Sequence, residues 1–265
     1  MSTPSTPTPR FPEAKSIFVE GRYRKLVRDL PQTVFFCPKC KGRGGCAYCD
    51  GLGKLTKDSV QELIGRVANP RFKARRNKFH GAGREDMDVR MLGRGRPFVL
   101  ELLKSKRHEV DLEEMASEIN RRAENRMEVL GLKYCQNSRV AEIKERHCSK
   151  EYRARLDFPA ETSLEEMEGK LQSLLVQGRL KLQQRTPQRV AHRRGDLVRE
   201  RGLEITAADQ EVDGLWVSLR ADHGTYIKEF ISSDDGRTAP SLAQLLETAC
   251  TCGLLDVLEI LDEDV

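Results

Sequence analysis

The chain has 265 residues, and its 46 lysines and arginines exceed its 41 aspartates and glutamates, which gives a formal net charge of +5. Hydrophobic residues make up 38% of the chain and charged residues 33%, so we expect a densely ionic surface around one sizeable core plus a small module, or around two ordinary cores. No run of about 18 apolar residues occurs, so no membrane-spanning helix is expected. The small basic excess is only a weak indication of nucleic-acid binding.

The N-terminal part of the chain divides into a tail, a strand and a helix. Residues 1–15 are rich in Pro, Ser and Thr, which predicts a disordered tail. This stretch lacks the apolar core of a secretory signal, so a cytoplasmic protein is expected. Residues 16–27 alternate apolar and polar side chains, as a strand does. Residues 58–67 predict a short helix, with Asp58 or Ser59 as its N-cap.

Two cysteine pairs lie between this strand and this helix. Four of the eight cysteines form two Cys-x2-Cys pairs, each followed by x-Gly-x-Gly: Cys37 with Cys40, and Cys46 with Cys49. Four thiolates at this spacing suit the tetrahedral coordination of a structural zinc ion. A redox role fits less well, because a redox pair normally stands alone near a βαβ unit. A similar tandem knuckle in DnaJ-type chaperones leaves a protein-binding interpretation of the module open.

The rest of the chain predicts the α+β class. Residues 79–98 are rich in glycine and arginine, and we expect a loop there that lets a ligand approach the main chain. Strands and helices then follow without strict alternation. The predicted strands span 97–103, 127–134, 140–144, 151–158, 178–184, 197–207, 215–221 and 254–261, and the predicted helices span 111–127, 163–177, 226–231 and 242–249.

The middle of the glycine-rich stretch reads Gly83-Arg84-Glu85-Asp86. A guanidinium beside a carboxylate favours the ionised form, so Asp86 is a candidate catalytic group. On composition alone, a basic surface turn in which Asp86 caps the next element is an equally good interpretation. Asp88 is the nearest rival carboxylate.

The tetrapeptide resembles the Gly-Arg-x-Asp catalytic loop of several pseudouridine synthases, and residues 81–98 resemble the Pus-ten family of archaeal and eukaryotic tRNA pseudouridine synthases. Further matches follow in the same order at residues 150–152, 185–194, 224–230 and 235–238. The resemblance implies a pseudouridine synthase fold, a central, mostly antiparallel sheet of two pseudo-symmetric halves flanked by helices. It places this catalytic domain at residues 58–265 and a small four-cysteine zinc module in the N-terminal segment 16–57.

The implied reaction breaks the N1–C1′ bond of a uridine and rejoins the uracil through C5. It needs a carboxylate beside the ribose but no organic cofactor, and the sequence leaves open whether that carboxylate attacks C1′ or removes the proton at C2′. By resemblance, Asp86 is this carboxylate, Lys228 is its cationic partner and Tyr152 receives the flipped base. The alternative for Tyr152 is an ordinary core tyrosine of a strand.

The resemblance also implies a substrate and the residues that bind it. The substrate is tRNA, at positions 54 and/or 55 of the TΨC arm. The implied substrate-binding residues are Arg84, Tyr226, Leu245, Arg189 and Arg193, with Leu242 as the alternative to Leu245. Family members carry a THUMP RNA-binding domain ahead of the region matched here, so a separate RNA-binding chain is an expected partner.

Two other classes of function compete with this interpretation. The first is a non-catalytic zinc-knuckle RNA-binding or chaperone-like protein on the same fold, and the presence of Asp86, Tyr152 and Lys228 disfavours it. The second is a nucleic-acid hydrolase in which Asp86 and Asp88 hold a divalent metal. The surrounding arginines disfavour that hydrolase, because they repel a cation.

Overall fold

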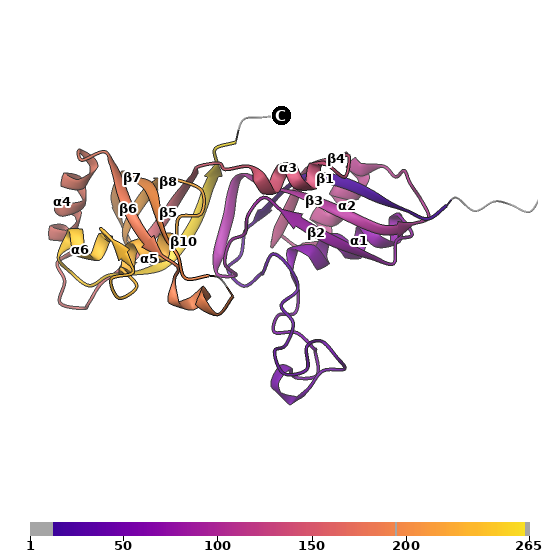
Figure 1. The fold of residues 1–265 in the computed structure, drawn as a ribbon, viewed down its shortest axis with the longest axis horizontal. Helices are drawn as coiled ribbons and strands as arrows, with labels where there is room; N and C mark the ends of the chain where they lie inside the picture. Colours follow the sequence, from indigo (N-terminus) through magenta and orange to yellow (C-terminus); the bar gives the residue numbers. More distant parts are fainter. Residues whose placement is uncertain (1–12, 194, 263–265) are drawn as a thin grey trace, which may run out of the picture. The chain divides into compact units, whose positions relative to one another are not determined.

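The computed structural model describes residues 13–193 and 195–262, without the side chains of His192 and Arg193 (Figure 1). Most of the predicted N-terminal tail, residues 1–12, therefore lies outside the described residues. Contacts divide the chain into two compact units. Among the described residues, the first unit contains 13–25, 29–84 and 96–145, and the second contains 26–28, 85–95, 146–193 and 195–262. The domain boundaries predicted after residues 15 and 57 separate the tail, the zinc-module segment and the catalytic domain. They do not correspond to these two compact units, and they stay a prediction.

The first unit packs helices against antiparallel strands. Its elements are β1 (Lys15–Lys25), α1 (Val60–Arg71), β2 (Arg76–Gly81), the later part of β3 (Val89–Ser105), α2 (Leu112–Arg122), β4 (Met127–Tyr134) and α3 (Arg139–Glu145). β1 pairs with β4, and β2 pairs with β3. Every second residue of β1 from Ile17 onward is buried, as its alternating sequence predicts. The rings of Phe79 and Phe98 stack in this core with their centroids 5.0 Å apart.

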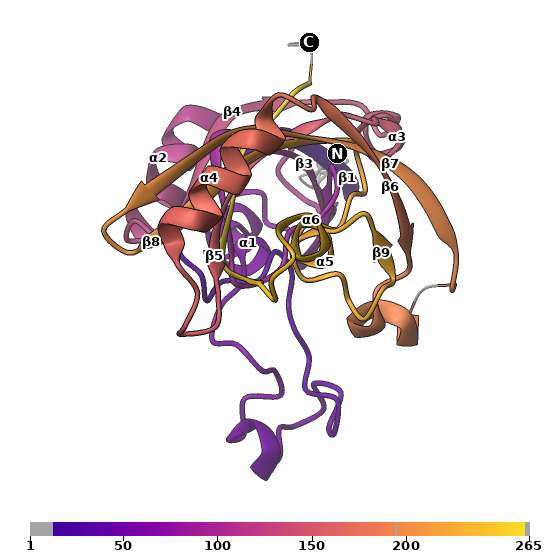
Figure 2. The same ribbon diagram turned by 90° about the vertical axis from the view of Figure 1, so that its left-hand side faces the viewer.

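The second unit is built on strands hydrogen-bonded in the order β3-β10-β5-β8-β7-β6-β9. These are the start of β3, β5 (Lys150–Asp157), β6 (Arg179–Arg185), β7 (Val198–Glu211), β8 (Gly214–Ala221), β9 (Thr238–Ala239) and β10 (Thr251–Ile260). Only the β3–β10 pair among these is parallel. Helices α4 (Leu164–Leu175), α5 (Ile227–Ser232) and α6 (Leu242–Leu246) share one apolar core with the strands. Figure 2 shows the backbone of these helices and strands from this side.

The three longest helices begin close to the residues at which the sequence predicts them to begin. Ser59 caps α1, Asp111 caps α2 and Ser163 caps α4, and each side chain accepts a hydrogen bond from the backbone N–H three residues later. The end of α1 was predicted too early, at Val67. The helix continues to Arg71 with Pro70 in its last turn, and the N–H of Phe72 closes it by donating to the carbonyl of Ala68.

The α+β class and the mostly antiparallel sheet are confirmed, but two predicted elements are wrong. Residues 140–144 form helix α3 and not a strand. Only Ile143 of this helix is buried, and Arg139 at its start forms ion pairs with Glu20 and Glu142. The predicted loop at residues 79–98 is mostly strand and leaves only residues 82–88 as a connection. Glycine is needed inside β3 because a Cβ on Gly93 would lie 2.1 Å from the carbonyl oxygen of Leu258. Within the described ranges, no helix is long and apolar enough to cross a membrane.

Candidate functional site

Asp86 lies in the connection that leads into β3, within the second unit. Its side chain is 37% exposed, and its Oδ2 lies 2.9 Å from Nη1 of Arg189 and 3.9 Å from Nζ of Lys228. The N–H of Val89 donates to the carbonyl of Asp86, so a turn sets this residue directly before the strand. Two cations therefore lie beside this carboxylate, and its partial exposure leaves it open to a ligand.

Arg189 links Asp86 to a second, buried carboxylate. It lies on the short 3-10 helix Gln188–Arg193, and its Nε is 2.5 Å from Oε1 of Glu229, while Nη2 donates to Oε2 at 3.4 Å. Glu229 belongs to α5, and its side chain is 6% exposed. Burial lowers the pKa of Arg189, but Glu229 and Asp86 outweigh burial and raise that pKa above its usual value. Arg189, predicted to bind substrate, is therefore a fixed cation between two acids.

Lys228 makes its shorter ion pair with Asp88. Its Nζ lies 2.6 Å from Oδ2 of Asp88, compared with 3.9 Å from Asp86. The resemblance pairs Lys228 with Asp86 and leaves Asp88 as the rival carboxylate. The structure brings all three together, with Arg189 as the nearer cation for Asp86.

A buried aspartate holds the start of β3 in place. Asp256 on β10 is 2% exposed, and it accepts from Nε of Arg90 at 2.8 Å and from Nη2 of Arg28 at 2.7 Å. Arg28 also donates to the carbonyl of Asp88 at 3.2 Å. These bonds fix the segment that carries Asp86. Asp256 and Glu229 are not among the residues predicted from the sequence, although Asp256 interrupts an apolar run and Glu229 follows Lys228 in a matched motif.

The aromatic and apolar candidates lie at different depths. Tyr152 is on the buried face of β5 and is 8% exposed. Tyr226 is half-buried at the start of α5, where the side-chain amide of Gln184 bonds both its N–H and its carbonyl at 3.0 Å. On α6, Leu245 is half-buried whereas Leu242 is fully buried, so only Leu245 keeps surface for a pocket wall.

Two predicted substrate-binding residues, Arg84 and Arg193, stay predictions. Arg84 is exposed and belongs to the first unit, whereas Asp86 belongs to the second. The side chain of Arg193 lies outside the described residues.

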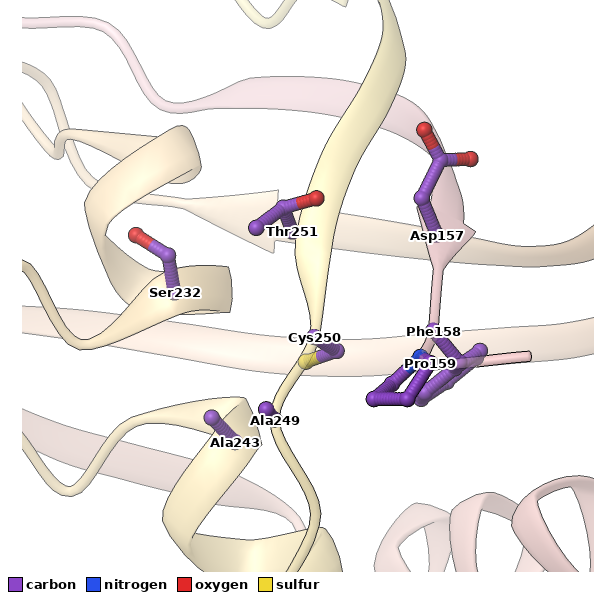
Figure 3. A pocket seen from close by; sticks show the side chains of 8 residues that line it. All are labelled: Asp157, Phe158, Pro159, Ser232, Ala243, Ala249, Cys250 and Thr251. Carbon is purple, nitrogen blue, oxygen red and sulfur yellow. The ribbon is translucent and has the colours of Figure 1, made fainter. Parts of the chain in front are cut away.

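A pocket of about 360 Å³ in the second unit contains none of the predicted site residues (Figure 3). It is lined by Asp157, Phe158, Pro159, Ser232, Ala243, Ala249, Cys250 and Thr251. Cys250 is its only thiol, and burial raises the pKa of this thiol to about 12, which leaves it unreactive at neutral pH. The pocket therefore offers no reactive thiol.

The four cysteines of the predicted zinc module converge in the first unit. The Sγ atoms of Cys37 and Cys46 lie 3.8 Å apart, those of Cys40 and Cys49 also 3.8 Å, and all four lie within 4.8 Å of one another. Zinc–sulfur bonds of about 2.3 Å give a tetrahedron with edges of about 3.8 Å. A disulfide would require about 2.05 Å. The donor set therefore fits one tetrahedral metal ion.

The two Cys-x2-Cys segments have the same backbone conformation after their second cysteine, and backbone N–H groups point toward the sulfur atoms. Lys41 and Asp50 both adopt positive φ, 52° and 49°, and each is followed by a glycine that also has positive φ, 78° at Gly42 and 76° at Gly51. The N–H groups of Cys46 and Gly53 donate to Sγ of Cys49 at 3.3 and 3.2 Å. Such bonds stabilise a metal-bound thiolate.

Comparison with known proteins shows which family the chain belongs to. The family model described as "Pus10, C-terminal" matches residues 18–261, and the chain belongs to this family. Curated relatives named "tRNA pseudouridine synthase Pus10" are 46% identical in Methanopyrus kandleri, over 98% of this chain, and 45% identical in Methanothermobacter marburgensis, over 92%. The chain spans 60% of the length of each of these two relatives. A crystal structure of a Cbf5–Nop10–Gar1 complex aligns over 92% of this chain and 60% of that chain, with 13% identity and a TM-score of 0.43.

Proposed function

We propose that the chain is an RNA pseudouridine synthase that isomerises uridine in tRNA at positions 54 and/or 55, in the cytoplasm, with Asp86 as its essential carboxylate. One observation carries the proposal: Asp86 of the Gly-Arg-Glu-Asp motif lies half-exposed between Arg189 and Lys228, in a chain of the Pus10 family.

The arrangement gives each residue a chemical task. The carboxylate of Asp86 acts at the ribose, by attack on C1′ or by removal of the C2′ proton, and both routes require its ionised form. Arg189 and Lys228 lie close enough to offset the charge of this carboxylate when bound RNA displaces water from the site. The N1–C1′ bond breaks, the C5–C1′ bond forms, and the proton lost from C5 is balanced by the one gained at N1. No organic cofactor takes part.

Pseudouridine mapping on an unmodified tRNA transcript tests this proposal. Wild-type protein with magnesium omitted should form pseudouridine at position 54, position 55 or both, because the reaction needs no divalent metal at the carboxylate. A transcript with cytidine at both positions serves as the control. Wild-type protein that is folded and zinc-loaded yet forms no pseudouridine in the unmodified transcript would contradict the proposal.

We propose that the ion held by the four cysteines is a structural zinc. The donor set of four sulfurs leaves no position for water, so the ion supplies stability rather than chemistry. Metal analysis of the purified protein should find about one zinc per chain.

A pair of cysteine variants separates this zinc site from the other thiols. Cys49→Ser should remove most of the zinc and unfold the module, because Cys49 lies between two other cluster sulfurs and accepts two N–H bonds. Cys135→Ser, at a half-buried cysteine outside the cluster, should keep the full zinc content. Equal zinc in the wild type and Cys49→Ser would argue against the site.

A further inference from the structure

The four-cysteine module, residues 35–57, carries an unusual share of exposed apolar surface. Five of the twelve large hydrophobic side chains exposed in the described part of the chain lie in it: Phe35, Phe36, Tyr48, Leu52 and Leu55. Phe36 and Tyr48 are 61% and 60% exposed. The centre of the module is occupied by sulfur atoms, so these side chains do not form its core. Apolar surface concentrated in this way marks an interaction site.

Phe36 is presented between two basic residues. A Cβ on Gly42 would lie 2.8 Å from Cδ1 of Phe36, so the ring already rests against the backbone between Lys41 and Arg43. The backbone of Phe36 also forms an isolated bridge with Lys54. One side of the ring is thereby fixed by the module, while much of the ring remains accessible.

Among the described residues, the cations beside this surface have no acidic partners. Lys39, Lys41 and Arg43 are exposed, and no ion pair joins any of them to another described residue. Lys54, in contrast, pairs with Glu62. Asp50 is the single acidic residue of the module. Exposed aromatic rings among uncompensated cations are the combination that binds unpaired nucleic acid, with bases on the rings and phosphates on the cations.

We propose that the four-cysteine module binds an unpaired stretch of RNA, with Phe36 and Tyr48 stacking on bases and Lys39, Lys41 and Arg43 contacting phosphates. The inference rests on the proposed function in taking RNA as the substrate. A protein partner fits less well, because lysine is depleted at protein–protein interfaces. The module thus adds RNA affinity outside the residues around Asp86.

Binding of fluorescently labelled RNA to the full, zinc-loaded chain tests this inference. The probes are a single-stranded uridine-rich oligonucleotide and an RNA duplex of equal length. Phe36→Leu/Tyr48→Leu, which keeps apolar bulk but removes the aromatic faces, should weaken single-strand binding by about tenfold or more. The control Val176→Ala, at a side chain exposed on another element, should not change it.

The salt dependence of binding tests the phosphate contacts separately. Lys41→Gln/Arg43→Gln should make the slope of log K against log salt shallower by about 1.4, or about 0.7 for each lost contact to a single strand. The matched control Lys106→Gln/Arg107→Gln removes one exposed lysine and one exposed arginine outside the module and should leave the slope unchanged.

Unchanged affinity and slope in both module variants, at wild-type zinc content, would overturn the inference, as would an equal loss of duplex binding. Pseudouridine formation at saturating tRNA is measured in parallel. Absence of product from the wild type counts against the proposed function, whereas intact product with unchanged binding in the variants counts against the RNA contact of the module alone.

Discussion

Asp86→Asn should abolish pseudouridine formation, with a fall in rate of about 10⁴-fold or more, as expected when the reacting carboxylate itself is removed. Asparagine keeps the size of the side chain but can neither attack C1′ nor accept the C2′ proton. The loss should appear in the single-turnover rate at saturating tRNA, because Asp86 acts after binding. Product is measured by pseudouridine mapping of the transcript.

Asp88→Asn is the matched control for this variant. Asp88 is two residues away, is also an acid and makes the shorter ion pair with Lys228. Its loss should reduce the rate far less, because Asp86 retains Arg189 at 2.9 Å. An equal or larger loss in Asp88→Asn would transfer the catalytic role to Asp88.

Arg189→Met should reduce both stability and activity. The substitution leaves the buried Glu229 without its cation and takes the nearer cation from Asp86. Breaking a fully buried pair costs about 3–5 kcal/mol, and since the Arg189 side chain is 40% exposed we expect roughly 2 kcal/mol here. Denaturant titration measures this cost, and single-turnover kinetics measures the loss of rate.

The double variant Arg189→Met/Glu229→Leu separates the two effects. It removes the uncompensated buried carboxylate, so the unfolding midpoint should return toward that of the wild type. The rate should stay low, because Asp86 still lacks its nearer cation. Recovery of both properties would show that Arg189 only offsets the charge of Glu229 and does nothing for Asp86.

Local signals account for the elements that the sequence predicted well. The capping residues Ser59, Asp111 and Ser163 act within one helical turn, and the predicted strand at residues 127–134 has the observed bounds. The exceptions depend on distant parts of the chain. Residues 79–98 have the composition of a loop, yet pairing with β2 and β10 makes most of them strand. Helix α3 is held by an ion pair to Glu20 on β1, which no local pattern reveals.

The candidate site also combines features that short sequence motifs predict with features that depend on distant parts of the chain. Short motifs pointed to Asp86, Lys228 and Arg189 as residues of interest, and the structure brings these three together. Their pairing was not readable, because Asp86 and Asp88 lie in one short connection and its backbone path decides which acid faces which cation. The support from Glu229 and Asp256 was missed because a buried carboxylate looks the same in a sequence as an exposed one.

Strand β3 belongs to both compact units, with Val89–Gly95 in the second and the remainder in the first. Because a chain is synthesised from its N-terminus, this division of β3 sets the order in which the two units can fold on the ribosome. Every segment of the first unit has been synthesised once residue 145 is added, whereas residues 85–95 must wait for β10 and for Arg189 before their contacts can form. A nascent chain therefore contains the acid of its candidate site long before the acid has its cation. We expect such incomplete chains to be inactive on RNA, however well their first unit has folded.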